Sequence, residues 1–173
     1  RNKESAKLNL ASVNPGDVAV VAVSPGEGLS RIFASLGVAA IVQGGQTMNP
    51  SVKELVAAFE NLPTDKIIIL PNNKNIILAA QNAVKVSVKK IAIIPTRNTP
   101  QGFAAMLRLI PDGTLEENEA SMCEAITEVH TGEITISTRS VEIEGVQVEK
   151  GQVIALYDGK LVSSSATIEG ALD

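Results

Sequence analysis

The chain has 173 residues, 45% of them hydrophobic, so it is long enough to bury the core of one domain. Its formal net charge of −4 gives no general attraction for nucleic acid or an anionic membrane, and we expect no nucleic acid partner. Aromatic residues make up only 2% of the chain, which argues against base or sugar binding by aromatic stacking.

The sequence also bears on the cellular setting. A single cysteine, Cys123, excludes an internal disulfide and is typical of a reducing compartment. We find no apolar run long enough to span a bilayer and no signal peptide. We therefore expect a cytoplasmic protein without a transmembrane segment. Because the chain begins with Arg1 rather than Met, we also expect it to be a piece of a longer protein.

The first segments in chain order are a polar stretch and a β/α region. Residues 1–16 are polar, and we expect a linker or a poorly ordered lead-in. From 17 to 110, apolar runs alternate with polar loops and helical patterns, which predicts an α/β fold: a mostly parallel open sheet with flanking helices. The expected strands are the apolar runs at 18–23, 38–42, 66–70 and 90–94.

Helix signals follow each of the four loops. Apolar residues recur at spacings of three and four, and cap residues precede them. In the first and fourth helices, Ile32 and Leu107 belong to these apolar stripes. The expected caps are Asn49, or Ser51 paired with Glu54, for the second helix, Asn73 or Asn75 for the third, and Thr99 before Pro100 for the fourth.

Residues 111–173 have a different pattern. Thr114 and Glu117 have capping-box spacing and begin a helix that we expect to reach about His130. Alternating apolar and polar residues then predict antiparallel strands, and Asp158-Gly159 marks a β-hairpin. From Ser163 the pattern favours another helix. We expect this part to belong to the same domain as the sheet, with a truncated C-terminal end.

Parallel strands would bring the four polar loops to one edge of the sheet, where open α/β folds bind ligands. In the loop at 44–50, paired glycines permit a positive φ and a close backbone approach. The side chains that follow offer amides and a hydroxyl suited to a carboxylate or phosphate; the alternative is a turn followed by a cap. The candidate residues of this loop are Gly44, Gly45, Gln46, Thr47 and Asn49.

Two further loops carry the remaining candidates. Three amides and an ammonium at 72–75 exceed what a helix cap requires, which favours a binding or interface role. The loop at 95–102 is similar, although Arg97 is equally consistent with a solvated side chain. The candidates here are Asn72, Asn73, Lys74, Asn75, Thr96, Gln101 and Gly102.

Other motifs favour structural interpretations. Gly26 and Gly28 follow a strand as in a phosphate-binding turn, but the third glycine of a dinucleotide site and the Gly-Lys-Ser/Thr of a P-loop are missing. Cys123 and His130 lie about two helical turns apart without further metal ligands or an orienting group, so we expect no metal site and no catalytic residue. A buried thiol and a helix-end histidine are the favoured interpretation.

Three stretches together resemble a known family. They are Gly44-Gly-Gln-Thr-Met-Asn-Pro50, Leu70-Pro-Asn-Asn-Lys-Asn-Ile-Ile-Leu-Ala-Ala80 and Ile94-Pro-Thr-Arg-Asn-Thr-Pro-Gln-Gly102. From about Asp17 onward, the chain is similar to the C-terminal region of the bacterial fatty acid kinase ATP-binding subunit. That subunit belongs to the dihydroxyacetone kinase-related family.

The resemblance implies a role within a larger enzyme. The family protein has an N-terminal kinase domain that uses ATP and Mg²⁺, a middle domain, and a C-terminal region similar in fold to its DegV-type fatty acid-binding partner. The kinase phosphorylates the fatty acid carried by this partner, giving an acyl phosphate for phospholipid synthesis. The aspartate-rich motif of the kinase domain is absent here, so we expect neither a cofactor nor activity in this fragment alone.

Three hypotheses remain open at this point. In the first, the loops dock the fatty acid-carrying partner so that a separate kinase domain can phosphorylate the acyl carboxylate. In the second, they bind a small ligand directly, either a fatty acid or phosphate. In the third, they support structure or homodimer formation in the full-length protein. A pocket lined with Ile, Val and Leu beneath the loops would favour direct fatty acid binding; polar loops over a filled core would favour docking.

Overall fold

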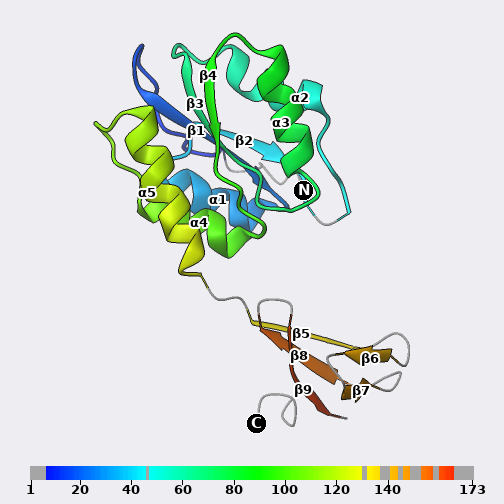
Figure 1. The fold of residues 1–173 in the computed structure, drawn as a ribbon. Helices are drawn as coiled ribbons and strands as arrows, with labels where there is room; N and C mark the ends of the chain where they lie inside the picture. Colours follow the sequence, from blue (N-terminus) through cyan, green and yellow to red (C-terminus); the bar gives the residue numbers. More distant parts are fainter. Residues whose placement is uncertain are drawn as a thin grey trace. The chain divides into compact units, whose positions relative to one another are not determined.

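The computed structural model describes residues 7–45 and 47–129, and beyond them the backbone of residues 132–136, 141–143, 146–148, 153–157 and 160–165. The chain divides into two compact units, Arg1–Val129 and His130–Asp173. The first unit contains the predicted β/α region together with the helix that follows it (Figure 1).

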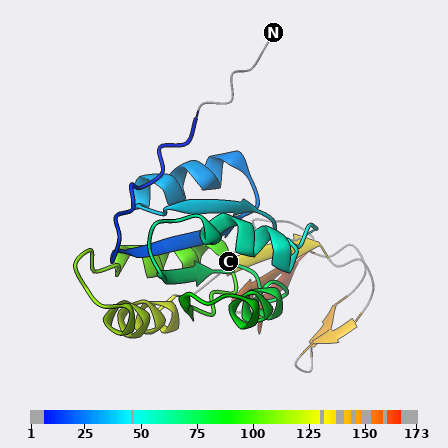
Figure 2. The ribbon, with the colours of Figure 1, turned by 90° about the horizontal axis from the view of Figure 1, so that it is seen from above.

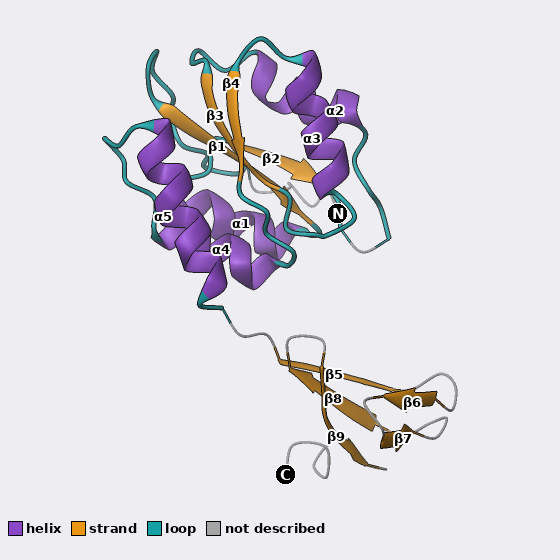
Figure 3. Cartoon of the chain, viewed as in Figure 1, coloured by secondary structure: helices purple, strands orange, loops and turns teal. Residues whose placement is uncertain are grey.

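The first unit is built on a four-stranded sheet in the order β2-β1-β3-β4. All three strand pairs are parallel, which confirms the predicted sheet. Figure 3 shows these strands in orange and the helices in purple. The elements in chain order are β1 (Val18–Ser24), α1 (Glu27–Leu36), β2 (Ala40–Gln43), α2 (Val52–Glu60), β3 (Lys66–Leu70), α3 (Ile77–Val86), β4 (Lys90–Ile93), α4 (Thr99–Leu107) and α5 (Leu115–Thr127).

Helices cover both faces of this sheet. Side chains alternate along β1, so that Val21 belongs to the cluster under α2 and α3, whereas Val20 belongs to the cluster under α1, α4 and α5. Phe59 fills the first cluster and Phe33 the second, and both rings are fully buried. Seen from above in Figure 2, the strands lie among the helices. Burial on both faces explains why the strands are continuous apolar runs.

The order of the strands creates a switch point at the centre of the sheet. From β1 the chain passes through α1 to β2 on one side, whereas from β3 it passes through α3 to β4 on the other side. The two connecting helices pack on opposite faces. The loops that leave β1 and β3 therefore diverge, which is the arrangement that opens a crevice at the carboxyl ends of a parallel sheet.

The structure decides between the two predicted caps of α2 and shifts the predicted cap of α4 by one residue. Helix α2 begins after Ser51, which forms a complete capping box with Glu54, so Asn49 is not its cap. Helix α4 is capped by Asn98, one residue before the predicted Thr99, because the Asn98 side chain accepts a hydrogen bond from the Gln101 N–H.

The third helix has no side-chain cap. The N-cap position of α3 is Ile76, and neither Asn73 nor Asn75 occupies it as predicted. Asn73 instead accepts a hydrogen bond from the Asn75 N–H at 2.9 Å, closing a turn that leads into the helix. At the fifth helix, the predicted capping box of Thr114 and Glu117 is present.

Two predicted core side chains point to solvent. Ile32 in α1 is 45% exposed and Leu107 in α4 is 74% exposed. The buried residues of α4 are Gly102, Ala105 and Met106, so its inward stripe includes small residues that a search for large apolar side chains overlooks.

The segment before the sheet is tied to the first unit over part of its length. The Ala11 N–H donates to the Val38 carbonyl at 3.0 Å, and Val13 packs against the α2–α3 side of the core. Residues 1–6 lie outside the described part of the chain.

The second unit contains the predicted antiparallel strands. They form a three-stranded sheet, β5-β8-β9, and a two-stranded sheet, β6-β7. Strands β8 and β9 pair as the predicted hairpin, while its turn residues, Asp158 and Gly159, lie outside the described residues. Ser163 to Ser165 belong to β9, so the helix predicted from Ser163 does not begin there. The strands are β5 (Gly132–Ile136), β6 (Val141–Ile143), β7 (Val146–Val148), β8 (Val153–Tyr157) and β9 (Lys160–Ser165).

Among the helices that the structure describes, none combines the length and the apolar character needed to cross a membrane.

Candidate functional site

The four strand ends surround a pocket of about 540 Å³. Residues from all four polar loops line it, as expected from parallel strands whose carboxyl ends lie at the same edge. The lining residues are Val23, Pro25, Gly44, Gly45, Thr47, Asn72, Asn73, Arg97, Asn98, Thr99 and Pro100.

Asn72 joins three strand ends. Its side-chain Nδ2 donates to the Val23 carbonyl of β1 at 2.9 Å, and its backbone N–H donates to the Thr96 hydroxyl beyond β4 at 2.9 Å. The residue is 8% exposed, and Thr96 is fully buried. Asn72 adopts a left-handed conformation with φ of 56°, which asparagine tolerates better than most residues. Asn72 and Thr96, both predicted as site residues, therefore connect the loops that follow β3 and β4.

Position 102 requires glycine because the Asn72 side chain lies against its backbone. A Cβ atom at position 102 would overlap the Asn72 carboxamide, with the Asn72 Cγ atom only 2.8 Å away. The Asn72 Oδ1 atom is buried and has no hydrogen-bond partner among the described residues. Since Nδ2 bonds to a carbonyl, turning the amide over would replace that bond with a repulsive contact between two oxygens.

The paired glycines of the loop after β2 are required because other residues lie very close to their backbone. A Cβ on Gly45 would lie 2.5 Å from the Pro25 Cβ, and one on Gly44 would lie 2.7 Å from the Pro50 Cδ. Neither glycine has a positive φ, so that part of the prediction is wrong. Gly45 and Met48 exchange backbone hydrogen bonds of 2.8 and 3.3 Å, which close the loop.

The polar candidates of this loop differ in what can be described. Thr47 and Asn49 are exposed, and Thr47 lines the pocket. Gln46 lies outside the described residues. Asn49 does not cap α2, which was one of the two predicted alternatives, because Ser51 is the cap.

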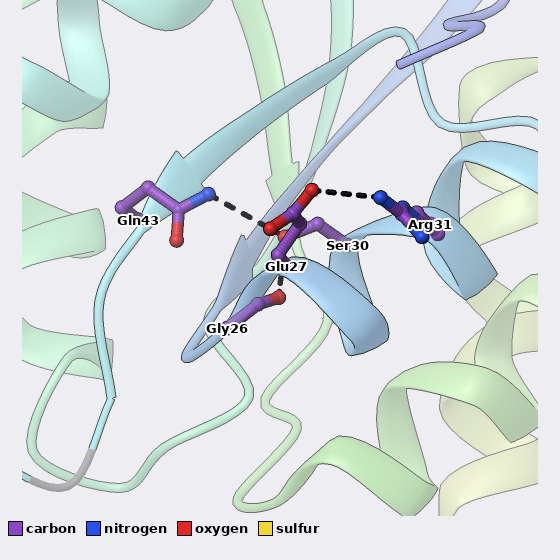
Figure 4. Close-up of polar contacts among 5 residues, drawn as sticks. All are labelled: Gly26, Glu27, Ser30, Arg31 and Gln43. Atoms are coloured by element: carbon purple, nitrogen blue, oxygen red, sulfur yellow. Dashed lines mark hydrogen bonds and ion pairs between the residues drawn. The ribbon is translucent and has the colours of Figure 1, made fainter. Parts of the chain in front are cut away.

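The loop after β1 is fixed by hydroxyl groups. The Ser30 hydroxyl lies 2.8 Å from the Gly26 carbonyl and 3.5 Å from Gln43 Nε2 (Figure 4). It also lies 2.9 Å from the Ser24 hydroxyl. Ser24 and Ser30 are fully buried. This network stabilises a tight strand-to-helix turn, the favoured interpretation of the glycines at 26 and 28. On the surface of the same helix, Glu27 and Arg31 form an ion pair of 2.8 Å.

The remaining predicted residues are more accessible. Lys74 and Asn75 are exposed, while Asn73 and Gln101 are half-buried. The Gln101 Oε1 atom accepts a hydrogen bond from the Arg97 N–H at 2.7 Å, which shapes the loop before α4. The exposed polar side chains thus belong to the same loops as a buried centre made by Asn72, Thr96 and Gly102.

Arg97 is the only ionisable residue among the described residues that line the pocket. Its side chain is exposed and forms no ion pair with the described residues. The first turn of α4, with its partial positive charge, lies in the same wall. The pocket therefore carries positive charge that no described carboxylate in its lining balances.

The structure gives the other chemical candidates no support. The pKa of the Cys123 thiol is raised, mainly by burial and to a smaller extent by the negative charge of the nearby Glu119 carboxylate. A raised pKa disfavours the reactive thiolate. His130 lies outside the described residues. Within residues 7–45 and 47–129, no group of three His, Cys, Asp or Glu side chains could hold a metal ion.

Sequence reasoning missed part of the pocket wall. Pro25, Asn98 and Pro100 line the pocket beside Arg97 and Thr99, although none of the five was in the predicted site. Arg97 could have been identified from the sequence, because it is the only charged residue in the loop at 95–102.

Comparison with known proteins places this domain in a family. Residues 19–173 match the family model for the C-terminal region of FakA-like fatty acid kinase proteins. Uncharacterised proteins of Staphylococcus aureus strains USA300 and N315 are each 38% identical over 166 residues. These matches cover 96% of the chain but only 30% of each relative, so the chain spans less than a third of the length of these relatives. The chain belongs to the family of FakA-like fatty acid kinase C-terminal regions.

Proposed function

We propose that this chain is the non-catalytic module of a fatty acid kinase that docks the fatty acid-carrying partner, a DegV-type protein. The family match supports the link to fatty acid kinases. The observation that carries the docking role is the exposed polar rim of Thr47, Asn49, Lys74 and Asn75 around strand ends fixed by Asn72. A rigid base with accessible polar groups suits protein recognition, because little entropy is lost on ordering.

The interior beneath the loops favours docking over direct binding of an acyl chain. Val23, Leu70 and Ile94 at the strand ends are at most 1% exposed, so the core beneath the pocket is filled. The pocket itself is lined mainly by Gly, Pro, Asn and Thr, rather than by the Ile, Val and Leu side chains that would solvate a hydrocarbon tail.

The proposed mechanism is positioning. The docked partner would present its acyl carboxylate to a separate kinase domain of the full-length protein, where ATP and Mg²⁺ would bind. Holding two reactants in a productive arrangement lowers the barrier for phosphoryl transfer without any covalent step at the docking module. The proposal places the protein in the cytoplasm, and a homodimer of the full-length chain is compatible with it.

A charge reversal on the rim tests the docking role. We expect the double variant Lys74→Glu/Asn75→Ala to bind the fatty acid-loaded partner about tenfold more weakly or worse, because exposed interface residues are lost and a charge is reversed. Calorimetry with the purified partner measures the dissociation constant. The unfolding midpoint should stay unchanged, because neither side chain forms a hydrogen bond or ion pair that supports the described fold.

The matched control is Lys85→Glu. Lys85 is exposed in the last turn of α3, whereas Lys74 precedes the first turn of the same helix. The control therefore makes the same charge change at the other end of the helix. Equal weakening by Lys85→Glu would point to a general charge effect, and unaltered binding of the double variant would reject this rim as the docking surface.

A further inference from the structure

The pocket between the strand ends has properties that docking does not require. We infer that it binds a phosphate group, either as inorganic phosphate or on a phosphate monoester, with Arg97 as the countercharge. This inference does not depend on the docking proposal, because it concerns a small ligand that the chain would bind alone.

The position of the pocket supports a ligand site. Its walls come from the ends of β1 and β3, whose following loops diverge to opposite sides of the sheet, and from the ends of both outer strands. Open α/β sheets bind small molecules at this switch point. A volume of about 540 Å³ lies within the usual range of small-molecule pockets.

The charge in the pocket selects an anion. Arg97 contributes a permanent positive charge, and no Asp or Glu is among the described lining residues. Since its guanidinium forms no ion pair with the described residues, it is available to a ligand. The first turn of α4 adds its partial positive charge from the same side.

The donors favour a tetrahedral anion over a planar one. Thr47, Asn73 and Thr99 line the pocket on three different loops and offer two hydroxyls and an amide. The Asn73 Oδ1 atom is already occupied by the Asn75 N–H, which leaves its amino group to donate. Donors that come from several loops can each meet a different oxygen of a phosphate group, whereas a carboxylate has only two oxygens to share among them.

One wall of the pocket is organised by Asn72. This residue has a left-handed backbone and a buried Oδ1 atom without a hydrogen-bond partner among the described residues. Residues other than glycine in this conformation are found most often where a site must be held in a fixed shape. The same residue holds the β1, β3 and β4 ends together, so it keeps the donor loops at fixed separations before any ligand arrives.

Titration of the isolated chain tests the inference. We expect inorganic phosphate to cause saturable shifts in the amide NMR signals of Gly44, Gly45, Thr47 and Thr99 at constant ionic strength. Arg97→Gln should weaken this binding by about 10- to 100-fold, because it removes a charge-assisted hydrogen bond. Its unfolding midpoint should match the wild type, since the Arg97 side chain is exposed and supports no described contact.

The matched control is Lys53→Gln, which removes an exposed cation from the first turn of α2, outside the pocket lining. We expect it to change the phosphate dissociation constant by less than about twofold, because exposed charges are screened by salt. Equal losses in the two variants, no saturable shift with phosphate, or equal affinity for acetate would each overturn the inference. Methyl phosphate distinguishes the two sources: tighter binding than inorganic phosphate identifies a phosphate monoester, and weaker binding identifies the free ion.

Discussion

At the residue scale, the contact between Asn72 and Gly102 shapes the candidate site. The carboxamide of Asn72 lies against the backbone of α4 at a position where no side chain fits. Its bond to the Val23 carbonyl holds it there, so it cannot turn away without losing that bond. One asparagine and one glycine thus set the distance between the β3 end and α4.

Two glycine substitutions test this contact. We expect Gly102→Ala to lower the free energy of unfolding by about 1–3 kcal/mol, because the added methyl group collides with a buried, bonded side chain. Gly28→Ala in α1 is the control, since a Cβ there meets nothing within 4 Å. It should raise the free energy of unfolding by about 0.5–1 kcal/mol through the better helix propensity of alanine. Urea denaturation measures both changes, and a neutral Gly102→Ala would contradict the contact.

At the scale of elements, two helices begin with reciprocal capping boxes. In α2 the Ser51 N–H donates to Glu54 Oε2 at 2.7 Å, and the Glu54 N–H donates to the Ser51 hydroxyl at 3.2 Å. Thr114 and Glu117 make the equivalent bonds at the start of α5, at 2.7 and 3.1 Å. These motifs are local in sequence, which is why spacing alone was sufficient to identify them.

Removing the cap of α2 should cost stability at that helix. We expect Ser51→Ala to lower the free energy of unfolding by about 1 kcal/mol, because the N–H of Glu54 loses its acceptor. Asn49→Ala is the control, since Asn49 is exposed and does not cap the helix. Denaturation curves that gave the larger loss for Asn49→Ala would show that the cap had been assigned to the wrong residue.

The same cap predicts a pH dependence. Hydrogen bonds from the Ser51 backbone N–H and then from its hydroxyl lower the pKa of Glu54 below its ordinary value of 4.5. A lowered pKa in the folded state means that the ionised carboxylate adds stability above pH 4.5 and loses it as the pH falls through the folded value. The stability difference between wild type and Glu54→Gln should therefore shrink in acid. An NMR titration that found the pKa of Glu54 at or above the ordinary value of 4.5 would contradict this assignment.

At the scale of the whole molecule, the first unit contains its own core. Both faces of the parallel sheet are covered by helices that precede residue 130. Strand β3 in the interior of the sheet has four consecutive buried residues, from Ile67 to Leu70. Burial of this extent on two faces is what an independently stable α/β layer structure requires.

Truncation tests this independence. We expect a fragment of residues 7–129 to unfold in a single cooperative transition in urea, because its own residues form the buried clusters on both faces of the sheet. Circular dichroism and the intensities of the backbone amide signals in NMR should give the same urea midpoint of unfolding. A broad transition or separate midpoints would show that residues beyond 129 are needed for the fold. The prediction that residues 111–173 form one domain with the sheet remains open to this same experiment.

Local patterns in the sequence were enough to predict most of the elements and the edge of the sheet at which the loops lie. Period, capping residues and apolar runs depend on neighbours within a few positions, so they predicted the four strands, the capping boxes and the parallel sheet. Three features required the folded structure: the strand order β2-β1-β3-β4, the burial of Asn72 and Thr96, and the presence of Arg97 and Thr47 in the lining of one pocket. Those features depend on contacts between segments distant in the chain, and no local pattern encodes which strand becomes the neighbour of another.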